Sequence, residues 1–295
     1  MLSILIPLHN YDINALTKSL ILQAEKTGID YEIIIVDDFS DMSYDAVNKL
    51  VISNKKVKFY KNSNNIGRSQ TRNKLADMAV YNNLLFIDCD AEICSENYLK
   101  NYINHFKNYK VICGGTDYQH NAPDMNYLLR WKYGVNREKI SSIKRNIFPS
   151  GSFSGFNFMI KKDVFQNIGF DESIYKYGHE DTLLGIELAK NNIEIKHIDN
   201  TLIHKGLEEN SVFLEKSIIA VDNLFYLYKN HPLSNELAKN IKILGWYKII
   251  NRCGLSVLLK PLYGIFGKLI KKNLLSNNPN LFLFDFYRLL NICSL

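Results

Sequence analysis

Two aspartates one residue apart, Asp88 and Asp90, directly follow the apolar run 84–87, which is long enough for one buried strand. Side chains alternate across a strand, so we expect both carboxylates on one face and Cys89 on the other. Close carboxylates repel each other unless a cation neutralises them, and Mg²⁺ or Mn²⁺ held in this way completes its coordination with substrate phosphates. The pattern indicates either a site for metal and phosphate or a strand end with solvated acids.

A turn at Asn65 and Gly67 precedes a helix that is predicted from Ser69 onward, with Arg72 in its opening turns. A helix start beside a basic residue suits a bound phosphate. A surface helix with solvated basic side chains explains the same residues equally well. The pattern G-x-x-x-x-G-K-[ST] is absent and the first strand lacks G-x-G-x-x-G, which argues against a P-loop protein and against a dinucleotide cofactor.

Two further acids, Glu180 and Asp181, follow Gly178 and His179 and open another predicted helix. Acids at the amino terminus of a helix complement the helix dipole in many proteins. The residues alone therefore favour a structural role for this pair.

Strands that alternate with helices must position these groups. Strands are predicted at 2–8, 31–36, 57–60 and 84–87, with helices at 15–26 and 44–52. This alternation predicts an α/β fold with a parallel doubly wound sheet, in which loops at the carboxyl ends of the strands form the binding crevice. The polar segments 7–10, 37–40 and 88–90 all fall at such ends, so we expect them at one edge of the sheet.

Five segments in order resemble the family 2 glycosyltransferases, which are inverting sugar-nucleotide transferases of the GT-A fold. They are PLHN (7–10), VDDFS (36–40), NNIGRSQTRN (64–73), LLFIDCD (84–90) and FDESIYKYGHED (170–181). The resemblance covers roughly residues 2–205. It implies a GT-A-type nucleotide-binding sheet flanked by helices, and a metal-dependent transferase of the hexosyltransferase type with Mn²⁺ or Mg²⁺ as cofactor.

The resemblance also implies roles for individual residues of the donor site. Asp38, with Asp37 beside it, would contact the base, and Arg72 would approach the diphosphate. Asp88 and Asp90 would bind the metal and the sugar nucleotide. The remaining expected nucleotide-sugar contacts come from the matching segments and are Pro7, His9, Asn10, Asn65, Gly67 and Cys89.

On the acceptor side, the resemblance assigns Asp181 as the base that takes the proton of the acceptor hydroxyl. Glu180 would hold the acceptor or orient the site. His204 would be a third metal ligand, although a lone histidine at this place is as consistent with a structural role. Tyr177 stands where the family often has tryptophan, which leaves the acceptor open.

The basic charge of the chain is concentrated in its last part. From Lys239 onward there are nine basic residues and one acid, a charge of +8, whereas the whole chain carries +6 and the rest therefore sums to −2. This asymmetry argues against a nucleic-acid binder, whose basic face should lie on the folded domain. Apolar and basic residues interleave over 237–295, and no run reaches the roughly 18 to 20 uncharged residues that a spanning helix needs. Amphipathic helices on an anionic membrane surface and a helical cap with solvated lysines are both consistent with this pattern.

The expected organisation is a catalytic domain at 1–207, divided into a nucleotide-binding half (1–115) and an acceptor half (116–207), followed by a helical basic extension at 208–295. The mixed stretch 116–149 is either an acceptor-side insertion or a plain excursion of two helices. The five cysteines form no C-x-x-C pair and no secretory leader is evident, so we expect the cytoplasm, with the protein peripheral on the cytoplasmic face of the membrane.

The predicted function is transfer of a sugar from a nucleotide diphosphate, UDP by resemblance, to a hydroxyl of a glycan or lipid-linked acceptor in surface polysaccharide assembly. One alternative is a nucleotidyltransferase, but the Gly-rich basic first loop of that class is missing and PLHN takes its place. The other is a non-catalytic nucleotide-sugar-binding protein. Gaps at the acidic positions would be expected for such a protein, and the sequence has none.

Overall fold

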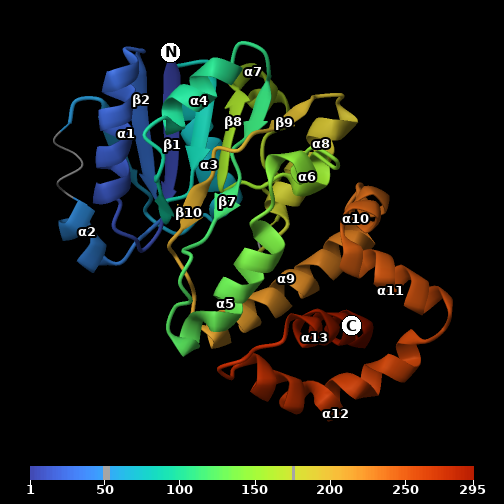
Figure 1. Cartoon of the computed structure of the whole chain (residues 1–295). Helices are drawn as coiled ribbons and strands as arrows, with labels where there is room; N and C mark the ends of the chain where they lie inside the picture. The colour runs from blue at the N-terminus through green and yellow to red at the C-terminus, as the bar shows by residue number, and fades with distance from the viewer. Residues whose placement is uncertain (49–53, 175–176) are drawn as a thin grey trace.

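A seven-stranded sheet forms the centre of the computed structural model, which describes residues 1–48, 54–174 and 177–295 (Figure 1). The strand order is β3-β2-β1-β4-β8-β6-β9. The strands are β1 (Leu2–Leu8), β2 (Tyr31–Asp37), β3 (Val57–Lys61), β4 (Asn83–Ile87), β6 (Val111–Cys113), β8 (Asn157–Lys161) and β9 (Ile195–His197). The prediction of an α/β sheet flanked by helices is confirmed.

The sheet is mixed, so the prediction of an all-parallel sheet is wrong for one strand. β1 pairs in parallel with β2 and with β4, and β2 pairs in parallel with β3. β8, however, runs antiparallel to both β4 and β6. The alternation of elements along the chain does not determine direction here, because the long segment between β6 and β8 returns the chain to the edge of the sheet at which β6 ends.

Helices cover both faces of the sheet. Leu16 of α1 (Asn14–Thr27) and Tyr98 of α4 (Tyr98–His105) pack in one core cluster with Ile4. The neighbouring Leu5 belongs to the opposite cluster. That cluster includes residues of α3 (Arg68–Met78), α7 (Lys162–Ile168) and α8 (Glu180–Lys190). Burial on both faces explains why the parallel strands are nearly continuous apolar runs.

The helix that was predicted at 44–52 is α2 (Met42–Asn48), and residues 49–52 of that prediction lie outside the described residues. A small second sheet, in the order β5-β10-β7, joins β5 (Ala91–Glu92), β10 (Leu202–His204) and β7 (Thr116–Asp117). Because β10 pairs with β5, His204 lies opposite Ala91, next to Asp90.

The stretch between β7 and β8 is mostly helical. It contains α5 (Leu128–Tyr133), a π-helical turn (Gly134–Glu138) and α6 (Ser142–Arg145), with short 3-10 turns at Met125–Tyr127 and Ser150–Ser152.

Residues after β10 form α9 (Asn210–Asn230), α10 (Ser234–Asn240), α11 (Lys242–Arg252), α12 (Ser256–Leu274) and α13 (Leu281–Ser294). α12 lies at the end of the molecule away from the sheet (Figure 1). Within the described residues, no helix is both long enough and apolar enough to cross a bilayer. The domain boundary at residue 207 stays a prediction.

Candidate active site

A cavity of about 460 Å³ lies beyond the ends of β4 and β6 and gathers most of the predicted catalytic and metal-binding side chains. Asp88 and Asp90 both line it, whereas Cys89 packs against the apolar core, as strand alternation predicts. The other predicted residues in its lining are Arg72, Glu180, Asp181 and His204.

Arg72 links the two acidic groups of this cavity. Its guanidinium, which α3 holds almost fully buried, donates to Asp88 at 2.8 Å and lies 3.6 Å from Glu180. Burial and the nearby Asp90 charge raise the pKa of Asp88 even though Arg72 opposes the rise. The Nε and Nη1 atoms of Arg72 have no hydrogen-bond acceptor in the described part of the chain. Both atoms are buried from solvent, so Arg72 would act on an anion in the cavity through its charge.

Asp90 is held by the last residue of β10 and by the residue that follows it. Its carboxylate lies 3.3 Å from His204 Nε2, and its carbonyl accepts from the Lys205 amide at 2.9 Å. Burial opposes ionisation of Asp90, but the hydrogen bond and charge of His204 lower its pKa below the usual value. Gly206 passes so close that an added Cβ would lie 2.2 Å from Asp90 Oδ2, so only glycine allows this approach.

Asp90 and His204 provide part of a coordination site that would suit Mn²⁺ or Mg²⁺. A carboxylate oxygen and an imidazole nitrogen 3.3 Å apart can share one cation whose shell a substrate diphosphate completes. The predicted three-residue set is not assembled, because Asp88 pairs with Arg72. Across residues 1–48, 54–174 and 177–295, no three His, Cys, Asp or Glu side chains form a group that could hold a metal ion.

Glu180 and Asp181 stand in the first turn of α8 with opposite shifts in pKa. Burial opposes ionisation of Glu180, yet Arg68 and Arg72, at 4.0 and 3.6 Å, lower its pKa. Burial and the negative charge of Glu180 raise the pKa of Asp181 to about 6. A carboxylate that titrates near neutral pH is suited to accept a proton from a hydroxyl group.

Arg68 is a cavity residue that the sequence analysis missed. Its guanidinium lies 4.0 Å from Glu180 and 5.0 Å from the centre of the Tyr177 ring. Residues four apart on a helix share a face, so Arg68 and Arg72 of α3 both reach the cavity. The position of Arg68, four residues before Arg72 in a predicted helix, was the feature of the sequence that could have identified it.

The predicted contacts at the ends of β1 and β2 lie outside the 460 Å³ cavity. Asp38 is buried, and its carboxylate accepts from the amides of Ile66 and Gly67 at 2.8 and 2.9 Å and from Asn62 Nδ2. Asp37 accepts from the Ser40 amide at 2.8 Å. These acids thus organise the two loops, and a contact of either with a base stays a prediction.

Three other predicted residues of this region contact the same loops. His9 Nδ1 lies 3.0 Å from the Asp38 carbonyl, the Asn10 amide donates to Ser40 Oγ, and Asn65 Nδ2 donates to the Asp38 carbonyl. Pro7 lies within β1. A smaller cavity of about 340 Å³ contains Asn65 and Gly67 and shares Arg68, Tyr177 and Glu180 with the larger one. The smaller cavity, beside the loop after β3, therefore adjoins the larger one.

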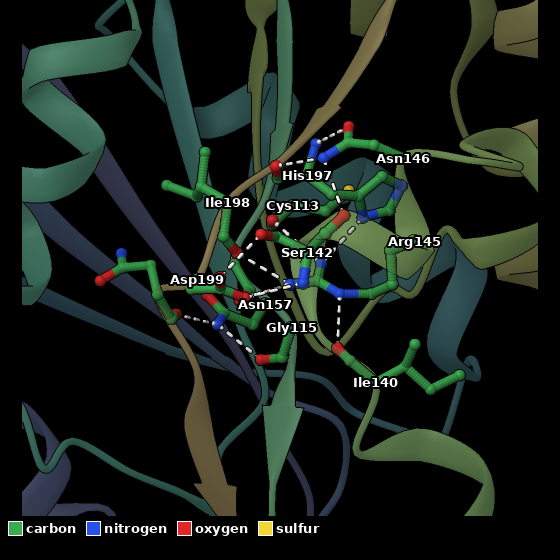
Figure 2. Close-up of polar contacts among 12 residues, drawn as sticks. Cys113, Gly115, Ile140, Ser142, Arg145, Asn146, Asn157, His197, Ile198 and Asp199 are labelled. Carbon is green, nitrogen blue, oxygen red and sulfur yellow. Dashed lines mark hydrogen bonds and ion pairs between the residues drawn. The ribbon is translucent and has the colours of Figure 1, made fainter.

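A buried arginine fastens the segment 118–156 between β7 and β8, which we call the cavity wall, to the sheet. Arg145 of α6 donates to the carbonyls of Ile140, Cys113, Gly114 and Ile198 at 2.8 to 3.2 Å (Figure 2). It also donates to His197 Nδ1 at 2.8 Å, so that His197 Nε2 carries the proton and donates to the Pro149 carbonyl. Burial and the Arg145 charge lower the pKa of His197 to about 4, so the ring stays neutral.

Arg130, Arg137 and Glu138 of the same wall also line the cavity, and the sequence pattern did not single them out. Arg130 is buried and pairs with Glu138 at 3.1 Å. Arg137 pairs with Asp285 of α13 at 2.9 Å, so the wall contacts the C-terminal helices.

Solved structures of two glycosyltransferases are similar to the whole chain. A mannosyltransferase from Pyrobaculum calidifontis, PcManGT, solved with GDP-Man and Mn²⁺, has a TM-score of 0.61 at 11% identity, covering 99% of this chain and 85% of its own. TarS 1-349 from S. aureus has a TM-score of 0.53 at 14% identity, covering 93% of this chain and 80% of its own. At such identities these likenesses establish the fold. A comparison with curated proteins gave no match.

The sequence model of glycosyl transferase family 2 matches residues 3–169, which is more than half of the chain. The matched segment contains Asp38, Arg72, Asp88 and Asp90, whose surroundings are described above. The resemblance inferred from the five motifs is confirmed, and the chain belongs to glycosyl transferase family 2.

Proposed function

We propose that the protein is an inverting, metal-dependent hexosyltransferase that moves a sugar from a UDP-sugar to a hydroxyl of a glycan or lipid-linked acceptor. The observation that carries this proposal is the composition of one cavity. It holds Asp181, whose pKa is raised to about 6, together with Arg72, Asp88 and Asp90. A base for the acceptor and a charged site for a diphosphate are the two requirements of a single displacement.

In this reaction Asp181 takes the proton of the acceptor hydroxyl while the hydroxyl oxygen bonds to the anomeric carbon. The bond from that carbon to the diphosphate oxygen breaks, and its electron pair leaves with the nucleoside diphosphate. Arg72 and Arg68 stabilise the departing charge, and Glu180 orients both guanidinium groups. A Mn²⁺ or Mg²⁺ ion held by Asp90 and His204, with Asp88 nearby, would supply further positive charge to the diphosphate.

UDP as the carrier rests on resemblance, and the structurally similar PcManGT was solved with GDP-Man, so the test must include both nucleotides. The acceptor proposal rests on the composition of the C-terminal helices, which combine lysines with exposed apolar side chains. A lipid-linked acceptor would place the reaction at the cytoplasmic face of a membrane, as part of surface polysaccharide assembly.

The test is release of nucleoside diphosphate from a panel of UDP-sugars and GDP-mannose with Mn²⁺, with and without EDTA. Wild type is compared with Asp181→Asn and Asp90→Asn, and with Asp77→Asn on the exposed face of α3 as a matched control. We expect metal-dependent release that both site variants lose by at least about a hundredfold. Donor binding, measured by calorimetry, should persist in Asp181→Asn and be lost in Asp90→Asn.

The two alternative functions give different results in the same assay. A nucleotidyltransferase would release pyrophosphate and not a nucleoside diphosphate. A non-catalytic binding protein would bind a nucleotide sugar without turnover, even with membrane extract as a source of acceptor. Either result would refute the proposal.

A further inference from the structure

α12 presents apolar side chains on the face that points away from the protein. Its inward face carries Tyr263, Gly267, Ile270 and Leu274, at the spacing of a helix that packs on a core. On the outward face, Val257, Leu258, Ile265 and Leu269 are between 63% and 75% exposed. A helix on the surface of a soluble domain normally has polar residues on its solvent-facing side. The exposed apolar side chains of α12 therefore indicate a surface that binds a partner.

α11, which the short segment 253–255 joins to α12, has the same character. Its Trp246 and Ile249 are 61% and 58% exposed, while Leu244 and Tyr247 are buried. We call the six residues Trp246, Ile249, Val257, Leu258, Ile265 and Leu269 the outer face. It belongs to the part of the molecule that lies away from the sheet (Figure 1).

The outer face is bordered by positive charge. Lys260, Lys268, Lys271 and Lys272 of α12 are exposed, and in the described part of the chain none of them forms an ion pair with an acid. A groove of about 450 Å³ beside Ile249 is lined by Lys229, Lys248 and Arg252, with no acid in its lining. The acid of α13, Asp285, is already paired with Arg137.

We propose that the outer face binds the surface of an anionic lipid bilayer, with α11 and α12 lying in the headgroup region. Apolar side chains would enter the boundary of the acyl chains while the lysines contact lipid phosphates, as in other interfacial amphipathic helices. A second copy of the chain fits less well, because a two-fold interface would bring this face against a copy of itself, and α11 and α12 contain no acid that could pair with the lysines. An anionic bilayer offers acyl chains to the apolar side chains and phosphates to the lysines.

The helices behind the outer face connect it to the catalytic cavity. Phe284 of α13 packs with Tyr133 and Phe213, at ring-centre distances of 5.4 and 5.6 Å, and Asp285 pairs with Arg137. Tyr133 and Arg137 line the cavity. Docking would therefore hold the cavity wall, which contains Tyr133 and Arg137, at a constant distance from the bilayer. This consequence rests on the proposed function, whereas membrane binding itself does not.

The experiment is co-sedimentation of the full-length protein with phosphatidylcholine vesicles, with and without about 30% phosphatidylglycerol. One variant, Lys268→Gln with Lys271→Gln and Lys272→Gln, removes charge. Its matched control, Lys100→Gln with Lys107→Gln and Lys110→Gln, removes the same charge from exposed positions of the sheet domain. A second variant, Val257→Ser with Ile265→Ser and Leu269→Ser, removes apolar contact. Its control is Leu22→Ser with Met42→Ser and Val80→Ser, which are also exposed.

We expect wild type to bind the anionic vesicles and to dissociate at high salt. The lysine variant should bind on the order of a hundredfold more weakly, from about fivefold per charge. The apolar variant should lose about tenfold or more, and both controls should stay within about twofold of wild type. Because all the substituted side chains are exposed, denaturation midpoints should not change.

Three results would overturn this inference. The first is binding by both the lysine variant and the apolar variant that equals that of wild type, and the second is no binding of wild type to anionic vesicles. The third is a dimer in sedimentation velocity that the apolar variant converts to a monomer, which would make a second copy the occupant. Donor turnover in lipid-free solution is measured separately, so a failure of membrane binding and a failure of the proposed reaction remain distinguishable.

Discussion

The charge state of Asp181 should determine how sugar transfer depends on pH. Its pKa is raised to about 6 by burial and by the negative charge of Glu180, against the opposing effect of Arg72. A base must be deprotonated to act, so kcat/KM should be constant at neutral pH and fall as the pH drops through about 6. At pH 5 about a tenth of the molecules would carry an ionised Asp181, which predicts a loss of about tenfold.

Glu180→Gln tests the cause of this shift. It removes the negative charge beside Asp181, so the midpoint of the acid limb should move from about 6 toward the ordinary aspartate value of 3.8, by about one unit. The plateau rate should also fall, because Arg68 and Arg72 lose the carboxylate that lies 4.0 and 3.6 Å from them. Glu187→Gln, on the same helix but away from the catalytic cavity, is the matched control and should leave the profile unchanged.

The assay is nucleoside diphosphate release at saturating metal over a pH series, with circular dichroism at each pH to verify that the protein remains folded. The reasoning is refuted if the acid limb of Glu180→Gln stays at that of wild type. It is refuted equally if wild type shows no limb near pH 6, or if Asp181→Asn retains the rate of wild type.

Three further substitutions test contacts around the cavity and in the loops beside it. Gly206→Ala should lower transfer about a hundredfold, because its Cβ would lie 2.2 Å from Asp90 Oδ2. The control Gly264→Ala, whose Cβ would meet no atom within 4 Å, should have no effect. The transfer rate and a metal titration of each variant test this. Arg145→Met should cost about 3 kcal/mol in urea denaturation, since three buried carbonyls and the half-buried Ile140 carbonyl each lose a hydrogen-bond donor. An unchanged midpoint would contradict the role of that guanidinium. Asp38→Asn should weaken nucleotide binding about tenfold and lower stability by about 1 to 3 kcal/mol, because two loop amides lose a charged acceptor. An affinity for UDP, measured by calorimetry, that equals that of wild type would argue against this.

Several features of the site could be predicted from local sequence because they depend on local rules. The run 84–87 is apolar because helices cover both faces of its strand, and Asp88 and Asp90 share a side because side chains alternate. Acids and basic residues at helix starts are equally local, and they drew attention to Arg72, Glu180 and Asp181, whereas the roles of Glu180 and Asp181 came from the family resemblance. Five such segments in order were enough to indicate the family.

Other features depend on contacts between residues far apart in the chain, and local patterns carry no information about them. His204 reaches Asp90 because β10 pairs with β5, and the reversed direction of β8 follows from where a long segment re-enters the sheet. Arg145 stood in the sequence as one basic residue among several, and only the fold places four carbonyls around it.

Neighbouring residues encode the main strands, the acids at their ends and the basic, apolar composition of the last helices, so these features can be recognised in the sequence. Which carboxylate is buried beside which guanidinium depends on the tertiary structure. It raised the pKa of Asp181, turned Asp88 toward Arg72, and left the outer face of α12 exposed while the opposite face packs. These properties arise from the desolvation and the charge of groups that only the folded chain brings together.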